Sequence, residues 1–401
     1  MKLLVVIENC SFPPRSGGAI VAFNVVRELQ SEHSITLLGF KPDIGVNDVP
    51  SLAGEVHWVQ RSDVQAGWSA WLRRLWGRFM WMLAPGCDVH ADSDLRAAID
   101  ALDKERCFDA ILLFELITLR HCSKELHQKI VVNAEDPQSI RAVRMAELPS
   151  CGWIKSLRLR LSGFLWRRYE SAVLGGVGRV LLLSRSDIED FSLSRRLNNI
   201  GHMRYAVDLK PGYQPTPFRE REKAIVYSGN MFHPPNIDGA LFLLEEIFPR
   251  ILERTRCIKL WIVGANPNAE ILEAARKFGD RVEITGSVDS VAAYVAKAVV
   301  SVCPVRLKIG VQTKILEALA AGTPVVTTGA GNSGVQGRAG RDLQVADDPD
   351  DFARMVCDFV VGKQWEEFSL EGRNFVAENF SWRQSAQDLT GHLAELMRRP
   401  R

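Results

Sequence analysis

Short apolar runs alternate with helical patterns along the first half of the chain. Six runs are expected to be strands: 2–8, 34–39, 55–60, 109–114, 129–133 and 179–184. Between them, apolar positions recur with helical spacing, as over 17–31, 92–103 and 137–147. Alternation of this kind predicts an α/β domain, in which an open parallel sheet is covered by helices on both faces.

The second half repeats this scheme and predicts a second domain of the same class. Its expected strands are 224–229, 258–263, 282–285, 299–303, 324–327 and 343–345. Its expected helices are 236–253, 268–277, 289–297, 312–321 and 349–361. Ligands of such sheets bind at the carboxyl ends of the strands. Two doubly wound domains that face each other would therefore form a binding cleft.

The segment between the two halves is rich in proline, charge and turn residues. We therefore interpret 207–222 as an interdomain linker. The predicted organisation is a first domain over 1–206, a second over 223–364, and a helical crossover and tail over 365–401 that returns to the first domain.

Composition narrows the class of protein. An apolar fraction of 46% and a charged fraction of 24% are ordinary for a water-soluble globular protein, and a net charge of +2 gives no reason to expect nucleic-acid binding. The eight cysteines include no Cys-x-x-Cys pair, so neither a metal nor a redox site is predicted, and buried thiols suit a reducing cytoplasm. The first apolar run ends at Glu8, so we interpret it as a strand rather than a signal peptide, and no apolar run is long enough to span a membrane.

The segment 310–326 carries the most specific chemistry. A loop ending at Gly310 leads into the helix expected at 312–321, which carries Lys314 and, about one turn later, Glu317. A helix amino terminus offers unpaired N–H groups and partial positive charge, so it is suited to an anion such as a phosphate. The alternative is an ordinary amphipathic helix with one surface lysine and one surface glutamate.

Arg306 favours the first of these interpretations. It follows the expected strand 299–303, and Lys308 lies close to it in the sequence. Together with Lys314, these cations at a strand end and the next helix start are suited to a diphosphate.

Glycines follow the first expected strand of each half. Gly229, followed by Asn230, lies where the backbone turns sharply or passes close to a ligand. Gly17 and Gly18 open a helix, where phosphate can approach the backbone, although their spacing is not that of a dinucleotide-binding fingerprint. Plain strand-to-helix turns are the alternative at both places.

Two acidic residues, Glu135 and Asp136, follow the expected strand 129–133 and precede Pro137. The carboxyl end of a strand is where the chemistry of a cleft would occur. Capping of the next helix by Asp136 is the alternative, and both roles are compatible.

Two stretches, 67–83 and 153–168, combine tryptophan with basic residues at helical spacing and contain no acidic residue. Basic amphipathic helices rich in tryptophan lie well at a membrane interface. Core packing of both helices is the alternative. The residues expected to contact a membrane are Trp68, Trp71, Arg73, Arg74, Trp76 and Arg78.

Taken together, these segments resemble the GT-B glycosyltransferases of family 4. The matching pieces include "PPRSGGAIVAFNVVREL", "YSGNMFHPPNIDGALFLLEEIFPRI", "VEITGSVDSVAAYVAKAVVSVCPVR" and "GVQTKILEALAAGTPVV". The resemblance covers nearly the whole chain and is strongest over 223–345. The chain is most similar to the sugar transferases of bacterial polysaccharide loci.

The resemblance implies transfer of a sugar, with retained configuration, from a nucleotide sugar such as a UDP- or GDP-sugar to a glycan or lipid-linked acceptor. It implies no essential metal and no cofactor. Glu317 is similar to the glutamate that holds the donor ribose. The donor's phosphates and sugar are then expected to contact Gly17, Gly18, Gly229, Asn230, Arg306, Gly310, Val311, Gln312, Thr313 and Lys314.

The resemblance also suggests how the reaction is assisted. Arg306 and Lys314 are expected to stabilise the leaving diphosphate, because Asn230 stands where an arginine is common. Glu135 and Asp136 stand where a sugar-contacting histidine is common, and we expect them to position the sugar. The expected location is the cytoplasm, peripheral on the inner face of the cell membrane. The alternatives are a nucleotide-sugar 2-epimerase of the same fold and a non-catalytic nucleotide-sugar-binding scaffold.

Overall fold

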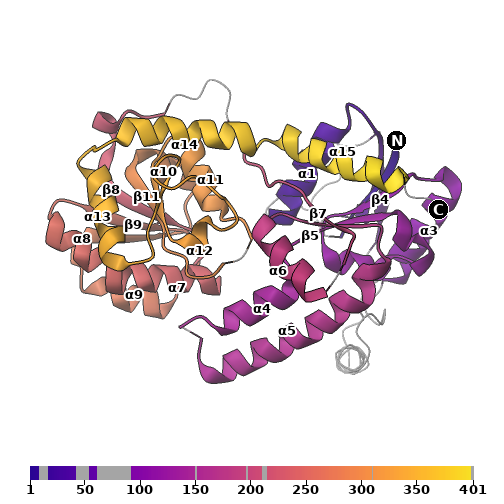
Figure 1. The fold of residues 1–401 in the computed structure, drawn as a ribbon, viewed down its shortest axis with the longest axis horizontal. Coiled ribbons are helices and arrows are strands. Elements are labelled where there is room, and N and C mark those ends of the chain that lie inside the picture. Colours follow the sequence, from indigo (N-terminus) through magenta and orange to yellow (C-terminus); the bar gives the residue numbers. More distant parts are fainter. Residues whose placement is uncertain are drawn as a thin grey trace. The chain divides into compact units, whose positions relative to one another are not determined.

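The computed structural model describes residues 1–8, 17–41, 54–60, 92–149, 151–195, 197–209, 215–308 and 310–398. They form two compact units, each built around a parallel sheet (Figure 1). The first unit comprises Met1–Ala142, Arg160–Tyr205 and Trp382–Arg401, and the second comprises Val143–Leu159 and Ala206–Ser381.

The first sheet has seven parallel strands in the order β3-β2-β1-β4-β5-β6-β7. Its strands are β1 (Lys2–Ile7), β2 (Ser34–Phe40), β3 (Glu55–Val59), β4 (Ala110–Leu113), β5 (Ile130–Glu135), β6 (Arg179–Leu182) and β7 (Ile200–His202). The inner strands are almost completely buried, because helices cover both faces of the sheet. That burial explains why they are continuous apolar runs in the sequence.

The helices of the first unit lie on both faces of this sheet. They are α1 (Gly17–Leu29), α3 (Ser93–Arg106), α4 (Gln138–Ala146), α5 (Trp153–Val173), α6 (Arg185–Arg195) and α15 (Trp382–Arg398), with the short 3-10 helices η2 (Leu116–His121), η3 (Lys124–Lys129) and η4 (Leu174–Gly176). The first residues of α5 and the last of α4 are grouped with the second unit.

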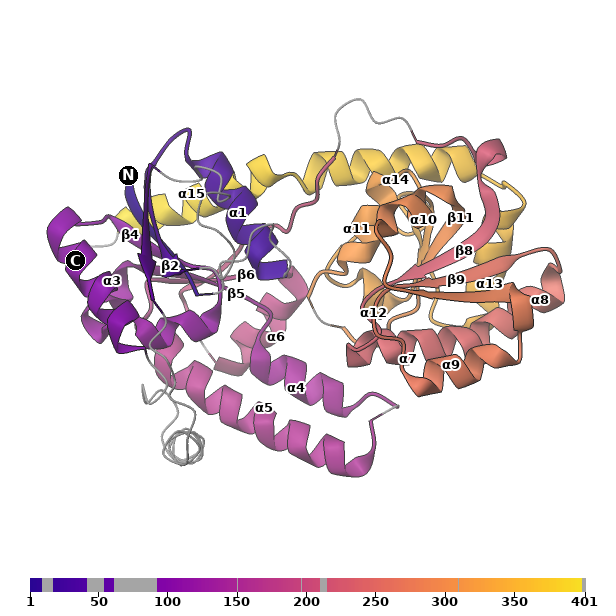
Figure 2. The ribbon, with the colours of Figure 1, turned by 180° about the vertical axis from the view of Figure 1, so that it is seen from behind.

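The second sheet has six parallel strands in the order β10-β9-β8-β11-β12-β13. They are β8 (Glu222–Ser228), β9 (Lys259–Val263), β10 (Val282–Gly286), β11 (Ala298–Cys303), β12 (Val325–Thr327) and β13 (Gln344–Val345). On one face α8 packs against α13, while α10, α11 and α14 cover the other (Figure 2). The helices are α7 (Pro234–Phe242), α8 (Phe248–Arg254), α9 (Ala269–Arg276), α10 (Val291–Lys297), α11 (Thr313–Ala320), α12 (Gly329–Asn332), α13 (Pro349–Val360) and α14 (Trp365–Asn379).

Three elements differ from the sequence prediction. The helix expected over 236–253 contains a π turn at Leu243–Ile247, where the N–H of Phe248 reaches the carbonyl of Leu243. Pro249 follows and has no N–H to donate, so a regular helical bond is missing there. Strand β7 was not predicted, because three residues are too short to give a pattern.

The third difference lies near the carboxyl end, where the helical stretch predicted over 365–401 is two helices, α14 and α15, interrupted after Asn379. Helix α15 packs against α1 in the first unit. The guanidinium of Arg204 forms two hydrogen bonds with the carboxylate of Asp388, at 2.7 and 2.8 Å, and these help to hold α15 there. The chain therefore returns to the first unit, as predicted.

Candidate functional site

The strand order of each sheet locates a candidate site. Successive strands run outward in one direction from β1 and in the other from β4, and the same reversal occurs between β8 and β11. In open parallel sheets, ligands bind at the carboxyl ends of the strands at this reversal, the topological switch point. We describe the site of each unit separately.

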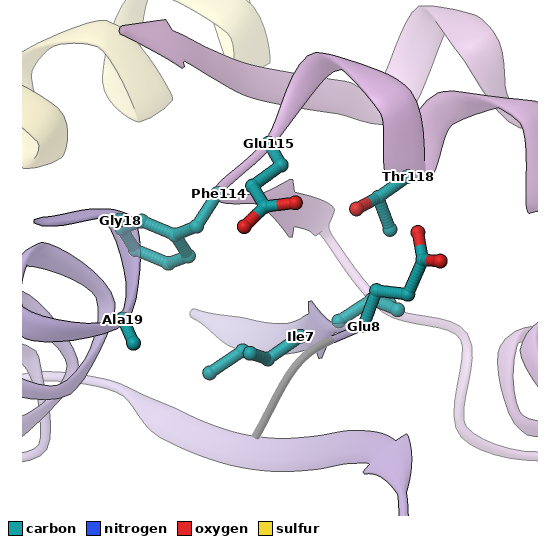
Figure 3. A pocket seen from close by; sticks show the side chains of 8 residues that line it. Ile7, Glu8, Gly18, Ala19, Phe114, Glu115 and Thr118 are labelled. Carbon is teal, nitrogen blue, oxygen red and sulfur yellow. The ribbon is translucent and has the colours of Figure 1, made fainter. Parts of the chain in front are cut away.

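In the first unit, a small pocket lies at the switch point (Figure 3). Strands β1 and β4 end at its edge, and the first turn of α1 and the start of η2 complete it. Figure 3 shows oxygen atoms of Glu8, Glu115 and Thr118 in the space between these elements. The lining residues are Val6, Ile7, Glu8, Gly18, Ala19, Phe114, Glu115 and Thr118.

Two basic side chains favour the ionised form of Glu8. Its carboxylate pairs with the guanidinium of Arg120 at 2.5 Å and lies 3.5 Å from Nε2 of His121. Burial alone would raise the pKa of Glu8, but hydrogen bonding to His121 and the charge of Arg120 outweigh it, so the pKa is lowered. Glu8 was predicted only as the end of a strand, and its partners lie more than a hundred residues away in the chain.

Gly18 and Glu135, both predicted from the sequence, are close together. A Cβ atom added to Gly18 would lie 2.7 Å from Oε1 of Glu135 and 3.7 Å from Oε1 of Glu115. Only glycine leaves room for the Glu135 carboxylate at this position. Gly17 begins α1 immediately before it.

The backbone of Glu135 is in the left-handed region, with φ of 55°. The pairing of β5 with β6 is irregular between Asn133 and Glu135, and Oδ1 of Asn133 accepts a hydrogen bond from the Glu135 N–H at 3.2 Å. A left-handed conformation is strained for a residue with a Cβ atom and often marks a functional position. The strain directs the side chain toward Gly18, where Oε1 is buried and has no hydrogen-bond partner among the described residues.

Burial raises the pKa of Glu135 to about 7, with smaller contributions from the negative charges of Asp136 and Glu115. Burial and the charge of Glu8 also raise the pKa of Glu115. Near neutral pH, Glu135 is therefore present in both its protonated and its ionised form. Such a carboxyl group can donate a hydrogen bond to a ligand oxygen or accept one from a ligand hydroxyl.

In the second unit, Lys314 lies at the switch point. It is the second residue of α11, and its Nζ donates a 2.7 Å hydrogen bond to Oδ1 of Asn236. The same Nζ lies 4.6 Å from the centroid of the Tyr227 ring and 3.1 Å from where a Cβ atom on Gly229 would be. Desolvation lowers the pKa of Lys314, against the opposing effects of Cys303 and Glu317. The structure thus brings Gly229 and Lys314 together, as an anion site requires.

Two glycines predicted as site residues, Gly229 and Gly310, allow close backbone approaches. Gly229 has φ of 154°, and its carbonyl oxygen is only 1.8 Å from where a Cβ atom on Gly264 would be. Gly310 has φ of 55°, and its carbonyl oxygen is 1.9 Å from the corresponding position on Gly334. The sequence prediction did not include Gly264 or Gly334, because their importance depends on which segments meet in space.

Arg306, by contrast, already forms an ion pair within the protein. Its guanidinium forms two hydrogen bonds, at 2.7 and 2.9 Å, with the carboxylate of Asp238, which is completely buried. It also lies over the ring of Phe242, at 4.6 Å. The charge of Arg306 is therefore largely balanced within the protein, and Lys314 is the stronger candidate for a diphosphate ligand.

The remaining predicted donor residues surround the start of α11. Val311, Gln312 and Thr313 are partly exposed and lead into the helix, and Gln312 is its N-cap residue. Glu317 is exposed on the same helix, yet its pKa is raised because surrounding protein removes part of its hydration. Asn230 follows Gly229 and is hydrogen-bonded within its own loop.

The first predicted membrane-contact stretch, with Trp68, Trp71, Arg73, Arg74, Trp76 and Arg78, lies outside the described residues. The second, 153–168, forms most of α5, where Trp166 packs against the core of the first unit but other large apolar side chains do not. Five large apolar side chains there are exposed and recur at helical spacing: Trp153, Ile154, Leu157, Leu161 and Phe164. Basic residues lie between and after them: Lys155, Arg158, Arg160, Arg167 and Arg168. Among the described helices, none has the length and apolarity needed to cross a bilayer.

Comparison with known proteins agrees with this picture. Residues 222–360 match the family model described as glycosyl transferases group 1. An uncharacterised 44.6 kDa protein of the cps region of Klebsiella pneumoniae is 26% identical over 163 residues, which cover 39% of this chain and 42% of that protein. The chain therefore matches less than half the length of this relative.

Solved structures share the fold of nearly the whole chain. HepE from Anabaena, in complex with UDP and glucose, has a TM-score of 0.65 at 12% identity, covering 98% of this chain and 99% of HepE. Sucrose-phosphate synthase from Thermosynechococcus elongatus has a TM-score of 0.67 at 16% identity, covering 98% of each chain. TarM has a TM-score of 0.68 at 10% identity, covering 99% of each chain.

The predicted GT-B fold is confirmed by these likenesses together with the two parallel sheets. The family match over the second unit and the likeness of the whole fold together support a GT-B glycosyltransferase.

Proposed function

We propose that this protein is a glycosyltransferase that moves a sugar from a nucleotide sugar to a hydroxyl group of a glycan or lipid-linked acceptor. The observation that carries the proposal is the position of the Lys314 ammonium group beside Gly229, at the switch point of the second sheet. A lysine at a helix start next to a glycine backbone can hold a diphosphate. The position also falls inside the segment matched by the glycosyl transferase family model.

The donor's diphosphate binds at Lys314 and the start of α11, and its ribose binds at Glu317. Bond breaking between the anomeric carbon and the diphosphate oxygen leaves negative charge on the diphosphate. Lys314 and the first N–H groups of α11 stabilise this charge as it develops. The acceptor hydroxyl forms the new bond on the same face of the sugar and gives its proton to the leaving diphosphate, so that configuration is retained and no metal is required.

The pocket of the first unit supplies carboxyl groups for sugar hydroxyls. Glu135, whose Oε1 is buried without a partner, forms a hydrogen bond with the transferred sugar or the acceptor, and Asp136 lies next to it in the chain. A uridine donor is favoured because HepE is described in complex with UDP-glucose. The relative from a cps region favours a role in polysaccharide biosynthesis.

Contact with a lipid surface is part of this proposal. The exposed part of α5 combines five large apolar side chains with five basic residues and no acid in 153–168. This combination suits a helix lying on a surface of anionic headgroups. A protein held there would meet a lipid-linked acceptor.

The experiment is a binding and turnover assay with UDP-glucose, UDP-N-acetylglucosamine and GDP-mannose, using membrane extracts as the source of acceptor. Lys314→Met should weaken nucleotide-sugar binding by roughly tenfold or more, because it removes the charge next to the diphosphate. The matched control is Lys363→Met, an exposed lysine of the same unit that pairs with Asp358. The proposal fails if the wild-type protein neither binds nor turns over any of these donors. Appearance of an epimer of the donor without acceptor, observed by NMR, would replace it with an epimerase.

A further inference from the structure

One aromatic side chain at the edge of the second site is not used by the proposed function. Phe232 lies in the loop between β8 and α7 and is 78% exposed. Burying a phenylalanine side chain stabilises a folded protein, so an exposed one forgoes that gain. Scattered apolar residues on a surface need no explanation by themselves, and the case for Phe232 depends on how its loop is built.

Hydrogen bonds hold this loop in one conformation. Oδ1 of Asn230 accepts from the N–H of Phe232 at 3.1 Å and from Nδ2 of Asn266 at 3.3 Å. The N–H of Met231 donates to the carbonyl of Ala265 at 2.9 Å, and the Met231 side chain is completely buried. With the preceding side chain fixed inward and its own N–H fixed, Phe232 is presented outward by the fold.

The same network connects Phe232 with the anion site. Nδ2 of Asn236 donates to the carbonyl of Asn230 at 3.0 Å, while Oδ1 of Asn236 accepts from Nζ of Lys314 at 2.7 Å. Asn236 therefore fixes the loop that carries Phe232 relative to the cation beside Gly229. The bonds of this loop with Ala265 and Asn266 also place it beside the segment that follows β9, the neighbour of β8 on the side opposite to β11.

We infer that Phe232 is a stacking surface for one ring of the bound nucleotide sugar; this inference rests on the proposed function. A diphosphate at Lys314 carries a ring-containing group on each side, a nucleoside and a sugar. Both the face of a nucleobase and the C–H face of a sugar are apolar surfaces that pack on an exposed aromatic ring. The rigid loop adds affinity, since little conformational freedom is lost when the ligand binds.

The test measures binding of UDP and UDP-glucose to the full chain by calorimetry, for the wild type, Phe232→Ala and Phe232→Tyr. Phe232→Ala should weaken binding by roughly tenfold, and Phe232→Tyr, which keeps the ring face, should retain wild-type affinity. Leu370→Ala is the matched control, because Leu370 is 60% exposed on α14, outside the site. A thermal unfolding curve for each variant checks that the fold is unchanged.

The two ligands distinguish the two rings. Equal weakening of UDP and UDP-glucose by Phe232→Ala identifies the base as the stacked ring, and weakening of UDP-glucose alone identifies the sugar. If the wild type binds and Phe232→Ala binds both ligands as tightly as wild type, the inference is wrong and the proposed function stands. If the wild type binds neither these ligands nor GDP and GDP-mannose, both are wrong.

Discussion

Oε1 of Glu135 lies 2.7 Å from the point where a Cβ atom on Gly18 would be. The distance is shorter than real Cβ contacts, so a side chain at residue 18 and the present position of the Glu135 carboxylate exclude each other. Because Glu135 ends β5 and Gly18 lies in the helix after β1, the contact fixes a carboxyl group at the carboxyl edge of the first sheet.

Gly18→Ala should therefore displace the Glu135 carboxylate. We expect a loss of about 1–2 kcal/mol in the free energy of unfolding, as is usual for overpacking a buried position, together with a marked loss of turnover. Urea unfolding and the sugar-transfer assay measure the two effects. Gly391→Ala is the control: a Cβ atom there meets nothing within 4 Å in α15, and the substitution should be neutral or stabilising. Wild-type turnover in Gly18→Ala would contradict the role of this contact.

Glu135→Gln should change how stability depends on pH. The folded protein holds the pKa of Glu135 at about 7, above its usual 4.5, so the folded state binds a proton more tightly than the unfolded chain between these values. The contribution of Glu135 to the free energy of unfolding is fully present below about pH 4.5. It is lost as the pH rises to about 7, which lowers the free energy of unfolding by up to ~3 kcal/mol. Glutamine cannot ionise, so the variant should lose less stability over this range than wild type.

The measurement is urea unfolding at several pH values from 5 to 8. Glu125→Gln, at an exposed position on η3, is the matched control and should keep the wild-type pH dependence. Because Glu115 also faces Gly18 and its pKa is raised as well, Glu135→Gln should reduce the slope rather than abolish it. An unchanged slope in Glu135→Gln would show that Glu135 is ionised throughout this range.

Arg306→Met tests whether Arg306 is structural or binds the donor. The substitution leaves the buried Asp238 carboxylate without its partner. Breaking a fully buried pair costs about 3–5 kcal/mol, and we expect about 2 kcal/mol here, because the guanidinium is 34% exposed and partly screened by water. Adding Asp238→Asn should recover part of this loss by removing the uncompensated charge. Donor affinity measured by calorimetry should change less than in Lys314→Met, and the reverse order would return Arg306 to the diphosphate site.

Changes in α5 test contact with lipid. Leu157→Ser together with Leu161→Ser should lower recovery of the protein in flotation with phosphatidylglycerol vesicles, because exposed apolar area is lost. Arg158→Gln together with Arg160→Gln should weaken vesicle binding by roughly thirtyfold, since each cation near an anionic surface contributes ~1 kcal/mol. Leu272→Ser, at an exposed position on α9, is the control. Equal recovery of all variants would show that α5 does not contact lipid.

Much of the fold was predictable because it depends on local patterns. Buried parallel strands are apolar runs in the sequence. Eleven of the twelve expected strands overlap β1–β6 and β8–β12, and the twelfth, 343–345, overlaps β13. Gly18, Glu135, Gly229 and Lys314 could be proposed as site residues for a related reason, since each lies at or after the end of an expected strand, at the edge where such sheets bind ligands.

The partners of these residues were not predictable. Arg120 with Glu8 and Asp238 with Arg306 are pairs far apart in the chain, and nothing in the local sequence distinguishes them from surface charges. The strained backbone of Glu135 has no sequence signal, because the residue is neither glycine nor asparagine. These features depend on how the two halves of each sheet meet, which periodicity does not determine.

The return of α15 to the first unit has a consequence for the order in which the protein matures. All strands of the first sheet precede residue 203, but the face of α1 that packs on α15, and the side chain of Arg204, lack their partners until residues 382–398 have been synthesised. The second unit, by contrast, has its whole sheet and α14 by residue 379. The unit whose synthesis begins first is therefore the one completed last, and the face of α1 that packs on α15 stays uncovered while translation continues.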